Sequence, residues 1–179
     1  TASSSAAPLA EMTPDSPVVA VLVARDPSAA FEDTLASLAA QDHPAFSILV
    51  IDDWSIEPVT ARVAAIVPSA FVRREEQPIG YGAAANLVRT MVSGAGFLLF
   101  CHDDVALAPD AARLLAAEAV RSGAAIVGPK LVAWTDHERL LAVGLGLDRA
   151  GNAVSVIERG ERDQGQHDVA TEAVAVPGA

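Results

Sequence analysis

Gly-Phe-Leu-Leu-Phe-Cys-His-Asp-Asp-Val, at positions 96–105, is a short apolar run that ends on a histidine and two acids. The apolar part is too short to span a membrane and is rich in Phe and Leu, which predicts a buried central strand of a parallel sheet. Ligands of open α/β sheets bind beyond the carboxyl ends of the strands, where His102, Asp103 and Asp104 fall. Such acids suit a hard divalent cation that also binds substrate phosphates. The alternative is a turn whose acids cap the helix expected from Pro109.

The segments around this run extend the prediction to a whole fold. Strand-like runs at 18–24, 46–51, 70–73 and 124–127 alternate with segments of helical periodicity, such as Phe31, Leu35 and Leu38. This alternation predicts an α/β fold with a Rossmann-type, mostly parallel sheet flanked by helices. We expect the helix after Pro109 to bury Leu114 and Leu115.

The two ends of the chain differ from this pattern. Residues 1–17 are rich in Ser, Ala and Pro, which predicts a flexible lead-in before one domain over 18–179. Residues 140–147 and 153–156 predict two strands about the turn 148–152, and 171–176 resembles a further strand. The polar residues 158–168 predict a mobile loop.

Composition excludes some classes of partner. The chain has 23 acids and 12 bases, a net charge of −11, which argues against a nucleic-acid surface. A phosphorylated ligand stays open, because a metal or a helix N-terminus can hold anions. The single cysteine, Cys101, cannot form an internal disulfide and weakly favours a reducing compartment.

A second acid pair, Asp52-Asp53, follows the strand predicted at 46–51. We expect the two strands to end side by side in one sheet, so that both pairs come within reach of one ligand. A carboxylate that does not bind the metal can accept hydrogen bonds from ribose hydroxyls. Capping of the following helix, helped by Ser55, is the alternative.

The glycine segment 80–86 lies before another predicted helix. Its backbone can approach a ligand, and the helix N-terminus can face a phosphate, but neither the dinucleotide fingerprint nor a P-loop is present. Among the histidines only His102 adjoins acids, so a His-rich zinc site is not expected. We expect His43 and His137 on the surface.

In order and spacing, these motifs resemble the family 2 glycosyltransferases, nucleotide-sugar enzymes with the GT-A fold. The resemblance runs over residues 18–179, and the alanine-rich composition looks like that of an actinobacterial member. It rests on Arg25-Asp26 after the first strand, the helix 34–41, Asp52-Asp53-Trp54-Ser55, the glycine segment to Asn86, the acids 102–104 with Pro109, and Val127-Gly128-Pro129-Lys130.

The resemblance implies a donor site for a nucleoside-diphosphate sugar, commonly a UDP-sugar. It implies that Asp104, with His102, ligates Mg²⁺ or Mn²⁺ bridging the diphosphate, and that transfer inverts the sugar as a carboxylate base deprotonates the acceptor hydroxyl. The residues that it implies for the nucleotide site are Ala24, Arg25, Asp26, Asp52, Asp53, Gly80, Asn86 and Asp103.

The sequence departs from the family in ways that shape these expectations. Asp26 stands where many members have Asn, and His102 replaces the first Asp of the metal element with a softer ligand. The family places its catalytic base after the strand that ends near Ala179, so we expect no catalytic residue within the chain, which would be truncated after its donor-binding half.

The resemblance also implies partners and a location. These are an acceptor glycan or glycolipid of the cell envelope, and a cytoplasmic protein, held at the inner face of the plasma membrane if a missing C-terminal region carries membrane helices. A face left bare by that missing region can pair two copies as a homodimer.

Two other functions stay open. A non-catalytic nucleotide-sugar-binding or scaffolding domain fits the acidic surface, His102 and the absent base. A nucleotidyltransferase would also use acids, a metal and a nucleotide, but it usually has a basic Gly-rich loop where this chain has Arg25-Asp26-Pro27.

Overall fold

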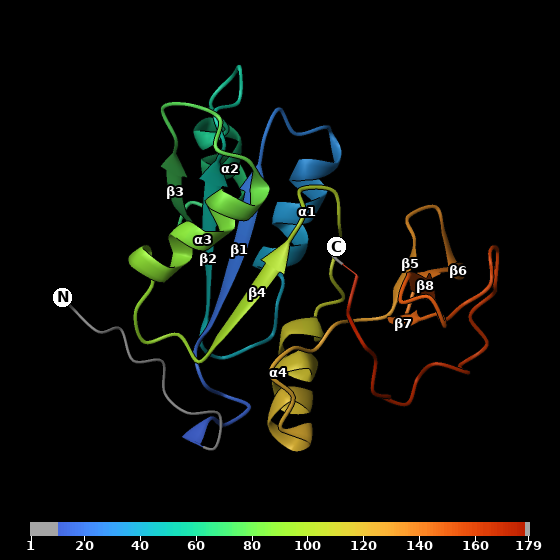
Figure 1. Cartoon of the computed structure of the whole chain (residues 1–179). Coiled ribbons are helices and arrows are strands. Elements are labelled where there is room, and N and C mark those ends of the chain that lie inside the picture. The colour runs from blue at the N-terminus through green and yellow to red at the C-terminus, as the bar shows by residue number, and fades with distance from the viewer. Residues whose placement is uncertain (1–10, 178–179) are drawn as a thin grey trace.

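The computed structural model describes residues 11–177 and contains a four-stranded parallel sheet between helices (Figure 1). Its strands are β1 (Val18–Ala24), β2 (Phe46–Asp52), β3 (Phe71–Arg74) and β4 (Phe97–Cys101), in the order β3-β2-β1-β4. All three pairings are parallel. The predicted α/β fold, a Rossmann-type parallel sheet flanked by helices, is confirmed.

Strand β1 lies at the centre of the core because both of its faces are covered. Ala20, Leu22 and Ala24 point toward α1 (Ala30–Ala39) and α2 (Thr60–Ile66), whereas Val21 and Val23 point toward α3 (Tyr81–Met91). This two-sided burial explains its continuous apolar sequence. On α1 the predicted stripe is confirmed; its buried residues include Phe31, Leu35 and Leu38.

Strand β4 does not take the central place that its sequence predicts. It lies at the edge of the described sheet, and its side chains Leu98 and Phe100 remain 41% and 43% exposed. Strand β1 therefore separates the two strands that end in acid pairs, so the prediction that they are neighbours is wrong as well. Strand order depends on pairing between distant segments, which the local apolar pattern of a strand does not encode.

Helix α4 (Ala111–Ser122) is joined at its start to the loop after α1, where Ala112 N–H donates to Gln41 Oε1, and its buried residues are small. Ala112, Ala116 and Ala119 are buried, while Leu114 is 52% exposed and Leu115 is only half-buried. The prediction that Leu114 points inward is therefore wrong. Alanines spaced by four and three residues form an apolar stripe of their own, which competes with the leucines for the packed face.

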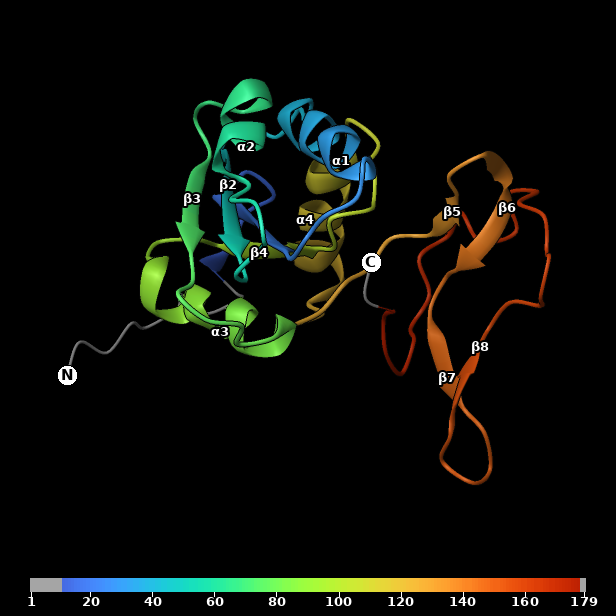
Figure 2. The same cartoon turned by 90° about the horizontal axis from the view of Figure 1, so that it is seen from above.

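The C-terminal part forms hairpins to one side of the sheet (Figure 2). No strand occupies 124–127, contrary to prediction; the next strand, β5 (Leu131–Ala133), pairs antiparallel with β6 (Asp136–Ala142). Strands β7 (Leu145–Leu147) and β8 (Ala153–Ser155) pair about the predicted turn, but 140–147 is divided between β6 and β7. The strand predicted at 171–176 is reduced to one bridge between Leu145 and Ala175.

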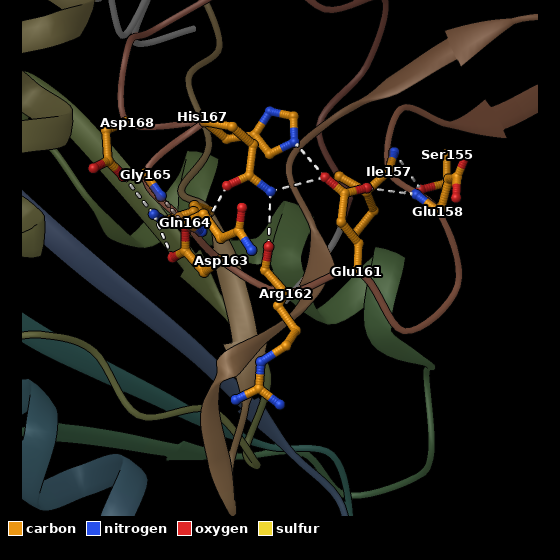
Figure 3. A network of polar contacts seen from close by, with 12 residues as sticks. Ser155, Ile157, Glu158, Glu161, Arg162, Asp163, Gln164, Gly165, His167 and Asp168 are labelled. Carbon is orange, nitrogen blue, oxygen red and sulfur yellow. Dashed lines mark hydrogen bonds and ion pairs between the residues drawn. The ribbon is translucent and has the colours of Figure 1, made fainter.

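The polar loop predicted at 158–168 is tied together by charged side chains. Lys130 Nζ lies 2.6 Å from Asp163 Oδ2 and 2.5 Å from Asp168 Oδ1. Within the loop, His167 Nε2 lies 3.1 Å from Glu161 Oε1 (Figure 3). Polar contacts thus join this loop to Lys130, at the end of the segment between α4 and β5.

Part of the predicted lead-in contacts the domain. Residues 1–10 lie outside the described residues, but the carbonyl of Pro14 lies 2.9 Å from His43 Nε2, and that of Pro17 accepts hydrogen bonds from the backbone of Gly96 and Phe97. His43 is 5% exposed, so its predicted surface position is wrong. None of the helices in residues 11–177 is long and apolar enough to cross a membrane.

Two leucine-to-alanine substitutions, one on the buried face of α1 and one on the outer face of α4, test this packing. Leu38→Ala removes a fully buried side chain of α1 and is expected to lower the free energy of unfolding by about 3 kcal/mol. Leu114→Ala, on the outer face of α4, is expected to change it by less than about 0.5 kcal/mol. Urea titration followed by circular dichroism measures both; equal losses would contradict the assigned faces.

Candidate functional site

The carboxyl ends of β1, β2 and β4 lie together along one edge of the sheet, which we call the carboxyl edge. It differs from the lateral edge, where β4 is the outermost strand. Ala24 is in register with Asp52, and Leu22 with Cys101. The loops that leave these strands therefore carry Arg25, Asp26, Asp53 and the acids 102–104 to the same edge. The structure brings together most of the predicted nucleotide-site residues, as expected for parallel strands.

Asp52 is a buried centre of hydrogen bonding. Its Oδ1 accepts from the backbone N–H of Ser55 (2.8 Å), and its Oδ2 accepts from Val59 N–H (3.3 Å) and from Arg74 Nη1 (2.6 Å). Burial alone would raise the pKa of this carboxyl, but the backbone and hydroxyl of Ser55, then Arg74 and Val59, outweigh it and hold the pKa below its usual value. Asp52 thus fastens the turn after β2 and the residue before α2, although the N-cap of α2, Val59, makes no side-chain cap hydrogen bond.

Asp53 joins β2 to the start of α3. Its Oδ1 accepts from Ile79 N–H (2.7 Å) and its Oδ2 from Gly80 N–H (3.0 Å). Gly80 has φ +81° and ψ 156°, a backbone conformation that only glycine adopts readily. The glycine that was predicted to approach a ligand also forms the turn that Asp53 fastens.

The loops after β1 and β2 are bonded to each other. Asp26 N–H donates to Ser55 Oγ (3.0 Å), and Ile56 N–H donates to Asp26 Oδ1 (2.7 Å). Asp26 and Trp54, with φ 49° and φ 62°, are the non-glycine residues of the described chain that have positive φ. These contacts fix the loops against each other at the edge of the sheet.

The acids after β4 form a less enclosed group. The pKa of the half-buried Asp103 is raised, first by burial and also by the charge of Asp104; its own backbone N–H, His102 and the backbone of Arg25 oppose the shift. The ring of His102 stacks on Tyr81 at the start of α3, with centroids 4.7 Å apart and planes 9° apart. Crowded carboxylates of this kind gain from a nearby cation.

Residues 11–177 contain no group of three or more His, Cys, Asp or Glu side chains that could hold a metal by themselves. Any cation at His102 and Asp104 would therefore need ligands from a bound molecule, which is usual for Mg²⁺ held beside phosphates.

Some expected residues stand apart, and others were missed. Asn86 is exposed on α3, beyond the contacts that join the loops. Arg74 was missed because only the register of β3, which pairs it with Asp52, reveals its role. It also lines an open hollow of about 570 Å³, whose lining residues are Arg73, Arg74, Glu75, Glu76, Gln77 and Ile79. Tyr81 was missed because its partner, His102, is far away in sequence.

A parallel sheet with polar residues gathered at its carboxyl edge places the chain among α/β proteins of the GT-A type, in agreement with its structural neighbours. A model of the family "Glycosyl transferase family 2" matches residues 19–166, and the chain belongs to this family. The resemblance seen in the sequence is confirmed. Among curated proteins, no match is found.

Several solved structures are similar to this chain at low sequence identity, and one of them is a mannosyltransferase. S. aureus TarS has a TM-score of 0.52 and 21% identity, covering 60% of this chain and 20% of that chain. Its fragment 1–349 gives 0.53 and 18%, covering 71% and 42%. The mannosyltransferase PcManGT from Pyrobaculum calidifontis, in complex with GDP-Man and Mn²⁺, gives 0.54 and 20%, covering 68% and 37%. This chain therefore spans less than half the length of each of these structures, and the likeness concerns the fold.

Asp52→Asn tests how much the buried charge of Asp52 and its hydrogen bonds contribute to stability. The amide NH₂ would replace Oδ2 and face the donors of Arg74 and Val59, so we expect a loss of about 2 kcal/mol in the free energy of unfolding. Because the pKa is lowered in the folded state, the loss should be full above the unfolded pKa of about 3.9 and shrink as the pH falls below it.

Urea titrations at several pH values measure this loss. Asp42→Asn is the control, because Asp42 pairs with Arg113 on the surface, where both side chains are over 40% exposed, and should change stability by less than about 0.5 kcal/mol. A loss for Asp52→Asn that stays constant down to pH 2 would contradict the assigned charge.

Gly80→Ala tests the turn that Asp53 fastens. A Cβ at Gly80 would meet nothing within 4 Å, so its cost comes from the backbone conformation alone, about 2 kcal/mol of stability. The control is Gly82→Ala, in the first turn of α3 and also without neighbours within 4 Å, which should stabilise by up to about 1 kcal/mol. Thermal unfolding compares the two; losses of the same size would refute the conformational explanation.

Proposed function

We propose that this chain binds the donor of a glycosyltransferase that moves a sugar from a nucleoside-diphosphate sugar to an acceptor hydroxyl. The observation that carries the proposal is the convergence of Asp26, Asp103 and Asp104 at the carboxyl edge of the sheet, on loops held in place by Asp52 and Asp53. Family membership supports the class of reaction.

The possible metal ligands in the loop after β4 fit a divalent cation. Asp103 and Asp104 offer hard oxygen ligands. The pKa of Asp103 is raised, first by burial and also by the charge of Asp104, so a bound cation would stabilise its charged form. We propose that Asp104, with His102, holds Mg²⁺ or Mn²⁺, which when bound neutralises the leaving diphosphate. The Mn²⁺ in the PcManGT structure supports this choice of ion.

Apart from the proposed metal ligand Asp104, the carboxylates at this edge divide into two roles. Asp52 and Asp53 are buried and accept hydrogen bonds from the protein, so we propose that they shape the nucleotide site from beneath. Asp26 and Asp103 are accessible and can meet ribose or sugar hydroxyls. The exposed residue Arg25 and the turn at Gly80 complete the surface available to a nucleotide.

The finer parts of the proposal rest on the family. We propose inverting transfer from a UDP-sugar to an envelope glycan or glycolipid on the cytoplasmic side, and we assign no residue of this chain as the base that deprotonates the acceptor. UDP in one TarS structure supports the uridine donor, whereas GDP-Man in PcManGT supports guanosine. A non-catalytic nucleotide-sugar-binding domain would use the same site without turnover.

Calorimetric titration of the chain with UDP, GDP and CDP, each with and without Mn²⁺, tests this function. We expect one nucleotide to bind in a metal-dependent way, and Asp104→Asn to weaken binding with Mn²⁺ at least tenfold. As the pH falls, protonation of Asp103 should weaken Mn²⁺-dependent binding at a higher pH than an ordinary aspartate would, because its pKa is raised.

Asp110→Asn is the matched control, on the same loop at the start of α4, where Asp110 pairs with Arg113 at 3.7 Å on the surface. It should bind as the unaltered chain does. Metal-independent binding, or binding unchanged by Asp104→Asn, would overturn the assignment of the metal ligand. If none of the three nucleotides binds, the proposal of a nucleotide-sugar site is wrong.

A further inference from the structure

Trp54 combines an exposed indole with an unfavourable backbone conformation. Its side chain is 48% exposed, and its φ is 62°, in the left-handed region. Aspartate, found at the other such position, visits this region with little penalty, but a bulky aromatic residue there is an outlier. Glycine would fit this turn better, so the presence of Trp calls for a reason outside local folding.

The surrounding contacts hold Trp54 in this conformation. The next residue, Ser55, donates its N–H to Asp52 (2.8 Å) and accepts at its carbonyl from Arg74 Nη2 (2.7 Å). The preceding residue, Asp53, is fastened to the turn at Gly80. Both neighbours of Trp54 are therefore fixed, and the backbone that carries the indole is held at the edge of the sheet by the protein itself.

Among the aromatic side chains on the loops at this edge, Trp54 offers a bare face. Tyr81 already stacks on His102, and the loop 25–29 contains no aromatic residue. Within residues 11–177, Trp54 takes part in none of the ring stacks or cation–π contacts. An unpaired indole on the loop that Asp26 contacts through Ser55 and Ile56 is suited to stack on a flat group of a ligand.

The strand order fixes where the rest of such a ligand would lie. Trp54 follows β2 and the acids 103–104 follow β4, with β1 between them. Two strand spacings amount to about 10 Å, a length that a nucleoside with its diphosphate can span.

We propose that Trp54 is a nucleotide-binding residue whose indole stacks on the base of the donor, while the diphosphate extends across β1 toward Asp103 and Asp104. This inference rests on the function proposed above. Because every base has a π face, such stacking adds affinity without selecting the base. Trp54 would thus strengthen binding of uridine and guanosine nucleotides alike, and other residues would choose between them.

The test uses the fact that the chain has two tryptophans, Trp54 and Trp134. In a Trp134→Phe background, Trp54 is the sole indole, and its fluorescence should be quenched saturably by the nucleotide that calorimetry shows to bind with Mn²⁺. Trp54→Gly should weaken calorimetric binding about tenfold, whereas Trp54→Phe, which keeps an aromatic face, should stay within about threefold of the unaltered chain.

A stability measurement separates this role from a structural one. Because glycine relieves the left-handed conformation, Trp54→Gly should melt at the same temperature as the unaltered chain or a few degrees higher, in spite of weaker binding. Unchanged binding by Trp54→Gly, or binding without quenching of Trp54, would overturn the inference and leave the donor site intact. A lower melting temperature would assign Trp54 to packing. If the unaltered chain binds no nucleotide, the proposed function and this inference fail together.

Discussion

The hydrogen bonds of one buried carboxylate, Asp52, hold the functional edge together. The carboxylate of Asp52 accepts hydrogen bonds from the loop after β2, from the start of α2 and from β3. Through Ser55, it also fixes the loop after β1. A buried charge is tolerated only when it is fully bonded, so each of these loops is constrained by the same requirement. The edge is therefore organised by the protein itself before a ligand binds.

The sequence predicted the elements whose signals are local. The β-branched run of β1, the acid-ended β2, the Phe31–Leu35–Leu38 stripe and the glycine turn at 80 all lie where expected. Each follows from periodicity or from a backbone requirement of a few consecutive residues. The convergence of Asp26, Asp53 and Asp103 at one edge was likewise predictable, because parallel strands end together.

The errors concern relations between distant segments. Three features depend on which surfaces meet: the outer position of β4, the exposure of Leu114 and the burial of His43 against Pro14. The apolar pattern of a single strand or helix contains no such information. The Asp52–Arg74 ion pair similarly depends on the register of β3. In a chain of net charge −11, these internal pairings decide which acids remain available to a cation and which do not.

The loop 158–168 has a different physical basis from the sheet. It buries no large apolar side chain and is joined to the rest of the chain by the ion pairs of Lys130 with Asp163 and Asp168 and by a few backbone hydrogen bonds to β6. Surface ion pairs are weak and are screened by salt, so this loop should open by local fluctuation without unfolding of the parallel sheet. Amide hydrogen exchange in the loop should thus respond to ionic strength, whereas exchange in β1 should follow global stability.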